Sequence, residues 1–335
     1  MSRYSRQELF AGIGPEGQAR LRSARVLVVG AGALGSALAE TMTRAGVGAL
    51  TVVDRDYVEE SNLQRQSLFD EEDARAGLPK AAAALKRLRT LNSDVEVRGI
   101  VADVGPDNAE ALVKGKALVL DGTDNFDTRF LLNDVCVRAG VPWVYGACVG
   151  SYGLALLVRP RVSPCLRCLL ETMPAPGSGA TCDTAGVVAP IVQVIAGIQG
   201  GEALKVLAGR TESLLKGLVS VDLWAGTFDV LDLSGRAPWC PACTAGRFEY
   251  VERAGTADVL CGRDAVQIRP AAQGPIDLGA LASRLRAVGE VTLNEYLVRF
   301  RALGRELVVF GDGRAIVKGV KDAAEARSVF ARYVG

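Results

Sequence analysis

The stretch VLVVGAGALGSALAE, residues 26–40, decides the fold. Four apolar residues lead into Gly30, Gly32 and Gly35, and a run of small residues with helical spacing follows. This spacing of glycines between a strand and a helix is the dinucleotide-binding fingerprint. The glycines permit a tight turn, a close approach to phosphate and close helix packing. The stretch therefore predicts a site for an adenosine nucleotide, but it does not choose between NAD and ATP.

Strand and helix patterns alternate on both sides of this turn. We expect strands over 25–30, 49–54, 95–100, 116–125, 141–150 and 152–160, helices over 33–45, 78–92, 126–140 and 187–209, and a hairpin over 218–233. The alternation predicts an α/β fold with a doubly wound, mostly parallel, Rossmann-like sheet. Ligands bind off the carboxyl ends of such strands. The glycine turn, Asp54 and the loop DGTDN (121–125) should therefore converge on one crevice.

The chain length and composition indicate two domains. With 335 residues, we expect a nucleotide-binding domain over 1–246 and a small C-terminal α+β domain over 247–335. The latter should contain a hairpin that turns at Gly311–Gly313. A segment rich in Pro, Gly and Ser, about 170–186, predicts a mobile loop.

Charge and residue usage exclude several classes of function. The net charge is +1, so we expect no nucleic-acid or membrane partner. No apolar run long enough for a membrane span and no signal peptide stand out, which makes the cytoplasm the expected location. The chain has no histidine, which excludes Ser-His-Asp hydrolases, Cys-His proteases and His-liganded catalytic metals.

Polar residues beside the predicted crevice favour ATP over NAD. Asp54 ends its strand nineteen residues after Gly35, where a carboxylate binds ribose hydroxyls. A triphosphate needs several cations, and Arg65 and Lys80 supply them. Asp124 is placed to hold magnesium that bridges phosphates. Asn62 and Gln66 could add neutral donors. Each residue alone could be an ordinary surface residue; together they indicate an ATP site.

Four of the eight cysteines form two CxxC pairs, Cys165–Cys168 and Cys240–Cys243. Four thiolates suit tetrahedral structural zinc, which here would clamp distant segments of the C-terminal part of the sheet domain. One pair alone could be a redox motif; two pairs in a histidine-free chain favour zinc.

The other cysteines lie in different contexts. Cys182 stands in the loop before a helix, where a thiol becomes more nucleophilic. The alternative is an incidental loop thiol. Cys136 and Cys148 lie among apolar residues and should pack in the core. Cys261 has no clear partner in the sequence.

These motifs together resemble the MoeB/ThiF/HesA family, the bacterial relatives of ubiquitin-activating enzymes. The resemblance runs over about seven-tenths of the chain and rests on RYSRQ (3–7), GAGALG (30–35), LTVVDRDYVEESNLQRQ (50–66), LPK (78–80), LDGTDN (120–125), PCLRC (164–168), TCDTAGVVAP (181–190) and WCPAC (239–243). It implies adenylation of the C-terminal Gly-Gly carboxylate of a ubiquitin-like sulfur carrier, with release of pyrophosphate. A thiocarboxylate for molybdopterin, thiamin or thiolated nucleosides would follow.

The resemblance also implies roles for individual residues. Arg65, Lys80 and Asp124 would be catalytic, with magnesium on Asp124. Arg6 would reach into the ATP site of a partner protomer, which implies a homodimer. Cys182 would link covalently to the carrier in ThiF-like members. The nucleotide contacts would be Gly30, Gly32, Ala33, Gly35, Asp54, Ser61, Asn62, Leu63, Gln64, Arg65, Gln66, Lys80, Asp124 and Asn125.

The sequence departs from the family at two places and leaves alternatives open. Ala33 replaces a glycine that the family usually has in the turn, and the tail lacks the cysteine-containing anion loop of a rhodanese. A separate sulfurtransferase or cysteine desulfurase is therefore an expected partner. An NAD(P)-dependent oxidoreductase with structural zinc, a nucleotide-binding scaffold without turnover, and a related enzyme that acts on a peptide or a tRNA are the alternatives.

Overall fold

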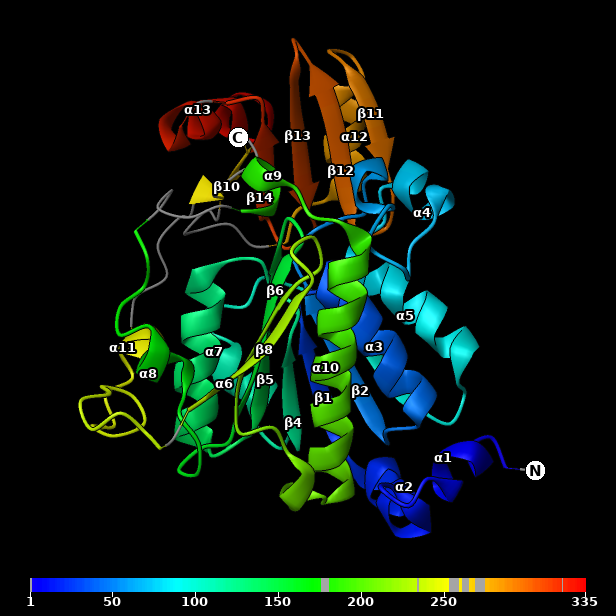
Figure 1. The fold of residues 1–335 in the computed structure, drawn as a ribbon. Helices are drawn as coiled ribbons and strands as arrows, with labels where there is room; N and C mark the ends of the chain where they lie inside the picture. The colour runs from blue at the N-terminus through cyan, green and yellow to red at the C-terminus, as the bar shows by residue number, and fades with distance from the viewer. Residues whose placement is uncertain are drawn as a thin grey trace. The chain divides into compact units, whose positions relative to one another are not determined.

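The computed structural model describes residues 2–175, 181–233, 235–252, 259–260, 265–268, 275–320 and 322–335 (Figure 1). The chain divides into two compact units. The first comprises Met1–Glu71 and Pro79–Ala254, and the second comprises Glu72–Leu78 and Gly255–Gly335. A short stretch from the first quarter of the chain thus belongs to the second unit, which the sequence patterns did not indicate.

The first unit is built on an eight-stranded sheet with the order β3-β2-β1-β4-β5-β6-β7-β8. The pairs from β3 through β5 are parallel, and those from β5 through β8 are antiparallel. The strands are β1 (Arg25–Val29), β2 (Ala49–Asp54), β3 (Glu96–Val101), β4 (Leu118–Asp121), β5 (Trp143–Val149), β6 (Tyr152–Val158), β7 (Gly217–Asp222) and β8 (Thr227–Asp232). The predicted mostly parallel α/β sheet is confirmed.

Helices cover both faces of this sheet (Figure 1). On one side, α10 (Ala189–Ala208) packs against α3 (Ala33–Ala45), β5 and β6, and α3 contacts α5 (Lys80–Leu91). On the other, α7 (Phe126–Ala139) contacts β5 and α6 (Ala109–Val113). The shorter helices are α1 (Ser5–Leu9), α2 (Gly14–Ser23), α8 (Leu166–Leu169), α9 (Cys182–Ala185), α11 (Glu249–Glu252) and the 3-10 turns η1 (Glu60–Asn62) and η2 (Thr211–Ser213).

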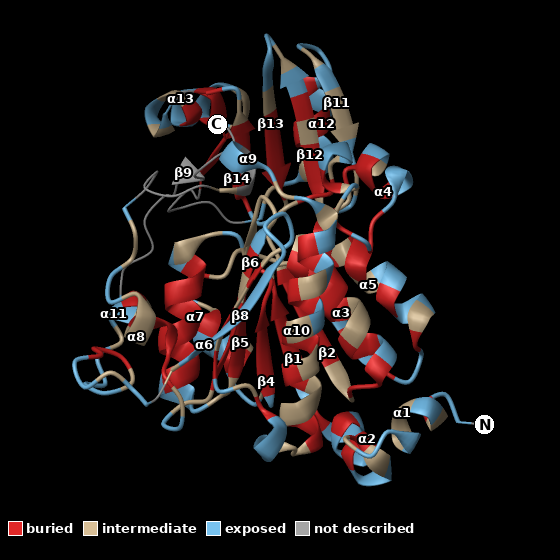
Figure 2. Ribbon diagram, viewed as in Figure 1, coloured by how far each residue is buried: buried red, intermediate tan, exposed pale blue. Residues whose placement is uncertain are grey.

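The core lies between the sheet and its helices, and Figure 2 shows β4 buried along its length. Residues 26–29 of β1 are also buried, as expected for a central parallel strand covered on both faces. Phe130 and Trp143 are among the largest fully buried side chains. A central strand with both faces covered holds the glycine turn that follows it rigidly.

Among the helices that the structure describes, α10 alone is long and apolar enough to cross a membrane. A little over half of it is buried inside the first unit. Its Gln199 side chain donates to the backbone carbonyls of Asp121 and Val144, in two central strands. The apolar composition of α10 therefore fits a helix that packs on the sheet.

The second unit has a six-stranded antiparallel sheet with the order β11-β12-β13-β14-β10-β9. Its elements are α4 (Glu71–Ala76), β9 (Val259–Leu260), β10 (Ala265–Ile268), α12 (Leu278–Leu285), β11 (Glu290–Leu293), β12 (Leu297–Ala302), β13 (Arg305–Phe310), β14 (Ala315–Lys318) and α13 (Ala323–Tyr333). Leu281 of α12 and Phe330 of α13 pack with Phe300 of β12 in one apolar cluster. Helices over an antiparallel sheet make the small α+β fold that we expected; Cys261 lies outside the described residues.

Candidate nucleotide site and cysteine cluster

The glycine turn after β1 has no room for side chains at two of its positions. A Cβ on Gly35 would lie 1.8 Å from the Gly30 carbonyl oxygen, and Gly30 itself has a φ of +85°. A Cβ on Gly122, in the loop after β4, would lie 2.6 Å from the Gly35 Cα. The turn and the DGTDN loop are therefore packed against each other. The sequence analysis missed Gly122, although a glycine directly after a central strand was a usable indication.

Gly32 differs from these glycines because it faces open space. The nearest atoms to a Cβ built on Gly32 are the Gly122 carbonyl oxygen at 3.8 Å and Gln66 Nε2 at 3.9 Å. Ala33 is the first residue of α3, half-buried, and its backbone amide lies at the helix N-terminus. The space beside Gly32 is where the fingerprint predicts the phosphate to approach.

Asp54 joins the turn to the end of β2. Its Oδ2 accepts a hydrogen bond from the Ala31 amide at 2.6 Å, and its Oδ1 accepts one from the Asp56 amide at 2.6 Å. Burial raises the pKa of Asp54, while the neighbouring Lys80 opposes that shift. The glycine turn, Asp54 and the DGTDN loop thus meet at one edge of the sheet, as we predicted.

Lys80 is a buried residue of this edge. It is the first residue of α5, is 2% exposed, and its Nζ lies 3.3 Å from Asp56 Oδ2. Its backbone amide donates to the Asp56 carbonyl oxygen at 2.8 Å. A buried lysine fixed beside the Asp54 carboxylate is not an ordinary surface lysine. Asp56, the second acid of the DRD sequence that begins at the last residue of β2, was not predicted as a site residue.

A second ion pair lies beside the first. Arg55 Nη1 is 3.3 Å from Asp103 Oδ1, which follows β3. Burial would lower the pKa of Arg55, but the charges of Asp103, Asp56 and Asp124 outweigh it and the net pKa is raised. Asp124 is exposed at this edge. The site is therefore rich in carboxylates, and Arg55 is one more cation there that the sequence analysis did not single out.

Two neutral residues of the predicted set are buried. Asn62 ends η1, and its Oδ1 accepts a hydrogen bond from the Glu59 amide at 3.2 Å. Gln66 is 3% exposed, and its Oε1 has no hydrogen-bond partner within the part of the chain that the structure describes. The nitrogen of this amide, Gln66 Nε2, is the atom next to the open space at Gly32, so the donor end of the side chain lies beside that space.

The remaining residues of this segment lie nearer the solvent. Arg65 is half-buried and donates from Nη1 to the Ser61 carbonyl oxygen at 2.9 Å. Ser61 and Gln64 are exposed, and Leu63 is half-buried. No contact recorded for the described residues joins the Arg65 side chain to Asp54 or Lys80.

The DGTDN loop is held by a buried ion pair. Asp121 Oδ1 accepts hydrogen bonds from the amide and the hydroxyl of Thr123. Arg129 Nη2 donates to the Thr123 carbonyl oxygen at 2.7 Å, and Arg129 Nε lies 3.7 Å from Asp121 Oδ2. Asn125 Oδ1 accepts from the Thr128 amide at 2.9 Å and caps α7. Asn125 therefore has a structural role besides any contact with a nucleotide.

Arg6 lies apart from this edge within its own chain. It is exposed on α1 and forms no hydrogen bond or ion pair with any residue that the structure describes. Its neighbours are fixed: the Tyr4 hydroxyl accepts from Asn92 Nδ2 at 2.8 Å, and Gln7 Nε2 donates to the Ala45 carbonyl oxygen at 2.9 Å. A fixed backbone thus presents Arg6 to the outside.

The predicted loop cysteine begins a one-turn helix. Cys182 is the first residue of α9, after the capping residue Thr181, whose hydroxyl accepts from the Thr184 amide at 3.2 Å. Residues 176–180 of the predicted loop lie outside the described residues. Cys136 is buried in the apolar core, which confirms the prediction, and burial raises the pKa of its thiol. Cys148 is only half-buried.

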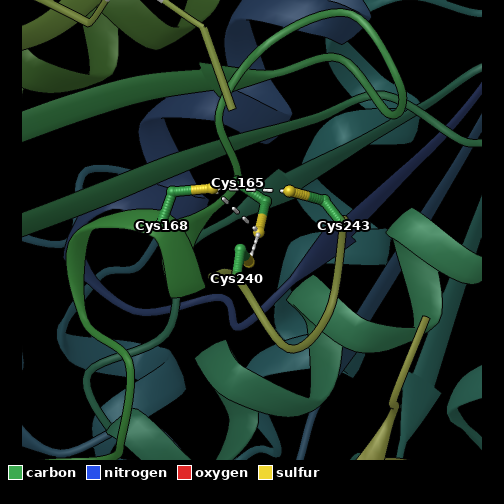
Figure 3. A group of neighbouring side chains, drawn as sticks. All are labelled: Cys165, Cys168, Cys240 and Cys243. Atoms are coloured by element: carbon green, nitrogen blue, oxygen red, sulfur yellow. Dashed lines mark hydrogen bonds between the residues drawn. The ribbon is translucent and has the colours of Figure 1, made fainter. Parts of the chain in front are cut away.

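The two CxxC pairs come together, as Figure 3 shows. The sulfur atoms lie 3.9 Å apart for Cys165 and Cys168, 3.6 Å for Cys165 and Cys240, and 3.4 Å for Cys168 and Cys243. All four lie within 4.8 Å of one another. Tetrahedral zinc with Zn–S bonds of about 2.3 Å places its sulfur atoms about 3.8 Å apart. The cluster fits such an ion and joins segments 75 residues apart.

The model of the ThiF family matches residues 4–242 of this chain. The chain belongs to the ThiF family. The curated sulfur carrier protein ThiS adenylyltransferase of Bacillus subtilis is 48% identical over 99% of both chains. The SAMP-activating enzyme E1 of Haloferax volcanii is 42% identical over 75% of this chain and 92% of its own. The sulfur carrier protein adenylyltransferase of Thermus thermophilus is 41% identical over 72% of this chain and 90% of its own.

The solved structures agree with this fold. A crystal structure of E. coli MccB with ATP matches with a TM-score of 0.63 and 22% identity, over 73% of this chain and 75% of the other. At that identity, the likeness concerns the fold alone. The ThiF-family match ends at residue 242, before Gly255–Gly335 of the second unit, whereas the Bacillus subtilis relative matches this chain almost throughout.

Proposed function

We propose that this ThiF-family chain is an ATP-dependent adenylyltransferase that activates the C-terminal Gly-Gly carboxylate of a ubiquitin-like sulfur carrier protein. The relatives reported above carry names of this activity. The observation that carries the proposal is buried Lys80, joined through Asp56 to Asp54 at the glycine turn. A fixed cation beside the turn suits a triphosphate, whereas a nicotinamide dinucleotide does not need it.

In this proposal the described residues divide the work of nucleotide binding. Asp54 accepts hydrogen bonds from the ribose, and the open space at Gly32 admits the phosphates. Lys80 and Arg65 neutralise phosphate charge, with Asn62 and Gln66 as neutral partners. These are the roles that oriented donors and cations play in other phosphoryl-transfer sites. Exposed Asp124 would hold magnesium, which supplies charge neutralisation on the phosphates when bound.

The reaction itself needs no general base. A carboxylate oxygen of the carrier's last glycine forms a bond to the α-phosphorus of ATP. The bond from that phosphorus to the bridging oxygen breaks, and pyrophosphate leaves with the electron pair. The attacking carboxylate is already ionised near neutral pH, so catalysis requires alignment and charge stabilisation. A chain without histidine can supply both.

Three further parts belong to the same proposal. Arg6 acts in the site of a second copy of this chain, since it is exposed on a fixed backbone. Cys182 is the residue that can form a covalent link with the activated carrier. Cys165, Cys168, Cys240 and Cys243 hold one structural zinc ion, which their geometry fits.

The test is ATP–pyrophosphate exchange that depends on an added carrier, measured across a panel of ubiquitin-fold carriers with Gly-Gly ends. We expect exchange with at least one carrier, and a loss of about 100-fold or more in Lys80→Ala, Arg65→Ala and Asp124→Ala. Lys86→Ala, at an exposed position of the same helix α5, is the matched control and should keep full activity. Absence of exchange with every carrier, together with NAD(P)H binding in a fluorescence titration, would favour the oxidoreductase alternative.

A further inference from the structure

The second unit contains a segment that comes just before Pro79 and Lys80 in the chain. We call residues 72–78 the strap; they lie inside the ThiF-family match but belong to the second unit. Asn294, between β11 and β12, donates from Nδ2 to the carbonyl oxygens of Ala76 at 3.1 Å and Gly77 at 3.3 Å. These are carbonyls at the end of α4, which have no partner inside their own helix. One side chain from the C-terminal unit thus caps the strap.

The Asn294 amide has a fixed orientation. Its Oδ1 accepts hydrogen bonds from the amides of Tyr296 at 2.9 Å and Leu297 at 3.0 Å, at the start of β12. The oxygen of this amide is therefore used within its own turn, and the nitrogen is used for the strap. Because the two ends of the amide have different partners, a substitution can remove one function and keep the other.

The strap also packs within the second unit. Asp73, Ala74 and Gly77 are buried. Gly77 has a φ of +58°, and a Cβ at this position would lie 3.7 Å from Nη1 of Arg299 in β12. Gly77 therefore lies beside β12 of the same unit.

Only one residue, Pro79, separates the strap from Lys80. Pro79 pairs with Tyr57 in an isolated antiparallel bridge, and the Lys80 amide donates to the Asp56 carbonyl oxygen at 2.8 Å. No side chain caps the start of α5 at Pro79. The entry to α5 is therefore fixed by backbone pairing on one side and, through the covalent chain, by the strap on the other.

We propose that Asn294 is a positioning residue for ATP binding, and that the C-terminal unit holds the strap so that Lys80 stays in place beside the phosphates. This inference rests on the proposed function of Lys80. When the strap is released, the first turn of α5 frays and Lys80 leaves its position for part of the time. The affinity for ATP falls, whereas kcat, the rate constant of enzyme that has bound both substrates, changes little.

The test compares three full-length variants. Asn294→Asp keeps the oxygen that Tyr296 and Leu297 need but turns a carboxylate oxygen towards the strap carbonyls. Asn294→Ala removes both sets of hydrogen bonds. Asp277→Ala is the control, since it removes only the N-terminal cap of α12, where Asp277 Oδ1 accepts from the Ala280 amide at 3.0 Å.

We expect Asn294→Asp to raise KM for ATP about five- to tenfold, the loss that one or two hydrogen bonds produce. The values of kcat and of KM for the carrier should stay near those of the wild type. Thermal stability should fall about as much as in the control Asp277→Ala, because the hydrogen bonds to the strap are lost. Asn294→Ala should raise KM for ATP similarly and also lower stability. Asp277→Ala should lower stability and leave KM for ATP unchanged.

Hydrogen exchange gives a readout that does not require activity. Asn294→Asp should increase amide exchange over residues 76–82, and Asp277→Ala should not. Unchanged exchange and unchanged KM for ATP in Asn294→Asp would overturn the inference. If no carrier supports exchange of pyrophosphate, the dissociation constant of a non-hydrolysable ATP analogue is measured for the same variants in place of KM for ATP. The effect of the strap on ATP binding is then judged apart from the proposed reaction.

Discussion

At the scale of single residues, two glycines of the turn have different roles: Gly35 is required for packing, whereas Gly32 leaves space for a ligand. Gly35→Ala places a methyl group 1.8 Å from the Gly30 carbonyl oxygen, so backbone must move. We expect a loss of more than about 3 kcal/mol in the free energy of unfolding. Gly32→Ala meets nothing nearer than 3.8 Å and should cost under about 1 kcal/mol.

The effect of Gly32→Ala should appear in ATP binding and not in stability. Gly32→Ala places its methyl group in the space proposed for the phosphates, so a folded protein with weakened binding of ATP is expected. Thermal unfolding and binding of an ATP analogue measure the two effects separately. Equal losses of stability in the two variants would contradict this assignment.

Some residues of the site could be predicted from the sequence, and others could not. Gly30, Gly35 and Asp54 were predictable because their spacing is local, within one strand–turn–helix–strand unit. Asp103 was not, because only the sheet brings the end of β3 beside Arg55. Gln66 was singled out as a donor, but its buried and unbonded Oε1 depends on the packing around it.

At the scale of elements, Asp134 of α7 links two helices and should make stability depend on pH. Burial raises its pKa from 3.8 to about 6, against the hydrogen bond from the Tyr250 amide in α11 and the charge of Arg167. At a pH between 3.8 and about 6, the Asp134 carboxyl is mostly protonated in the folded chain and mostly ionised in the unfolded chain. Stability therefore falls as the pH rises from about 4 to 6, by about 1–3 kcal/mol for this group.

Asp134→Asn should remove that component. We expect the difference in unfolding free energy between the variant and the wild type to shift in favour of the variant as the pH rises through this range. Chemical denaturation at a series of pH values measures it, and the difference cancels the other titrating groups. Parallel curves for the two proteins would refute the prediction.

The cysteine cluster should couple metal content to the stability of the elements that it joins. Cys165 precedes α8 and Cys168 lies within it, whereas Cys240 and Cys243 lie in the loop after β8, so one ion would fix both segments. We expect one zinc per chain by elemental analysis. Removal by a chelator, or Cys240→Ser, should lower the unfolding temperature and release zinc. Cys136→Ser changes a core thiol that lies outside the cluster, so it should keep the zinc. Zinc-free protein of unchanged stability would contradict a structural role.

The long helices were predictable from periodicity, whereas the short helix α4 and the short strand β11 were not. The sequence patterns predicted the ends of α3 and α7 closely, because a glycine with positive φ follows each helix, Gly46 after α3 and Gly140 after α7. They gave no indication of α4, a helix of 6 residues, or of β11, because neither has enough residues for a period to stand out. The place of α4 in the second unit depends on contacts that are distant in sequence.

At the scale of the whole molecule, the proposed exchange of Arg6 between two copies predicts complementation. Arg6→Ala and Lys80→Ala should each be inactive alone. In a mixed dimer, the Arg6→Ala copy keeps Lys80 and receives Arg6 from its partner. Mixing equal amounts under exchange conditions should therefore restore about a quarter of the wild-type activity, for random pairing in a two-fold symmetric dimer.

The control for that experiment is a mixture of Lys80→Ala with Asp124→Ala. We place Lys80 and Asp124 in the ATP site of the copy that carries them, so neither residue can be supplied by the partner. No mixed dimer then contains an intact site, and activity should stay absent. Activity in this control, or none in the first mixture, would argue against Arg6 acting across a dimer.

The strap also has a consequence for the order in which the protein becomes functional. Gly77 and its partner Asn294 are 217 residues apart in the chain. Domains fold in the order in which they leave the ribosome, with the N-terminal part first. The sheet and the glycine turn can form early, but Asn294, which caps the strap, is made 217 residues after Gly77. A chain that stops before Asn294 would carry every proposed ATP contact and still bind ATP poorly, so full affinity would mark a protein in which the second unit has been made and folded.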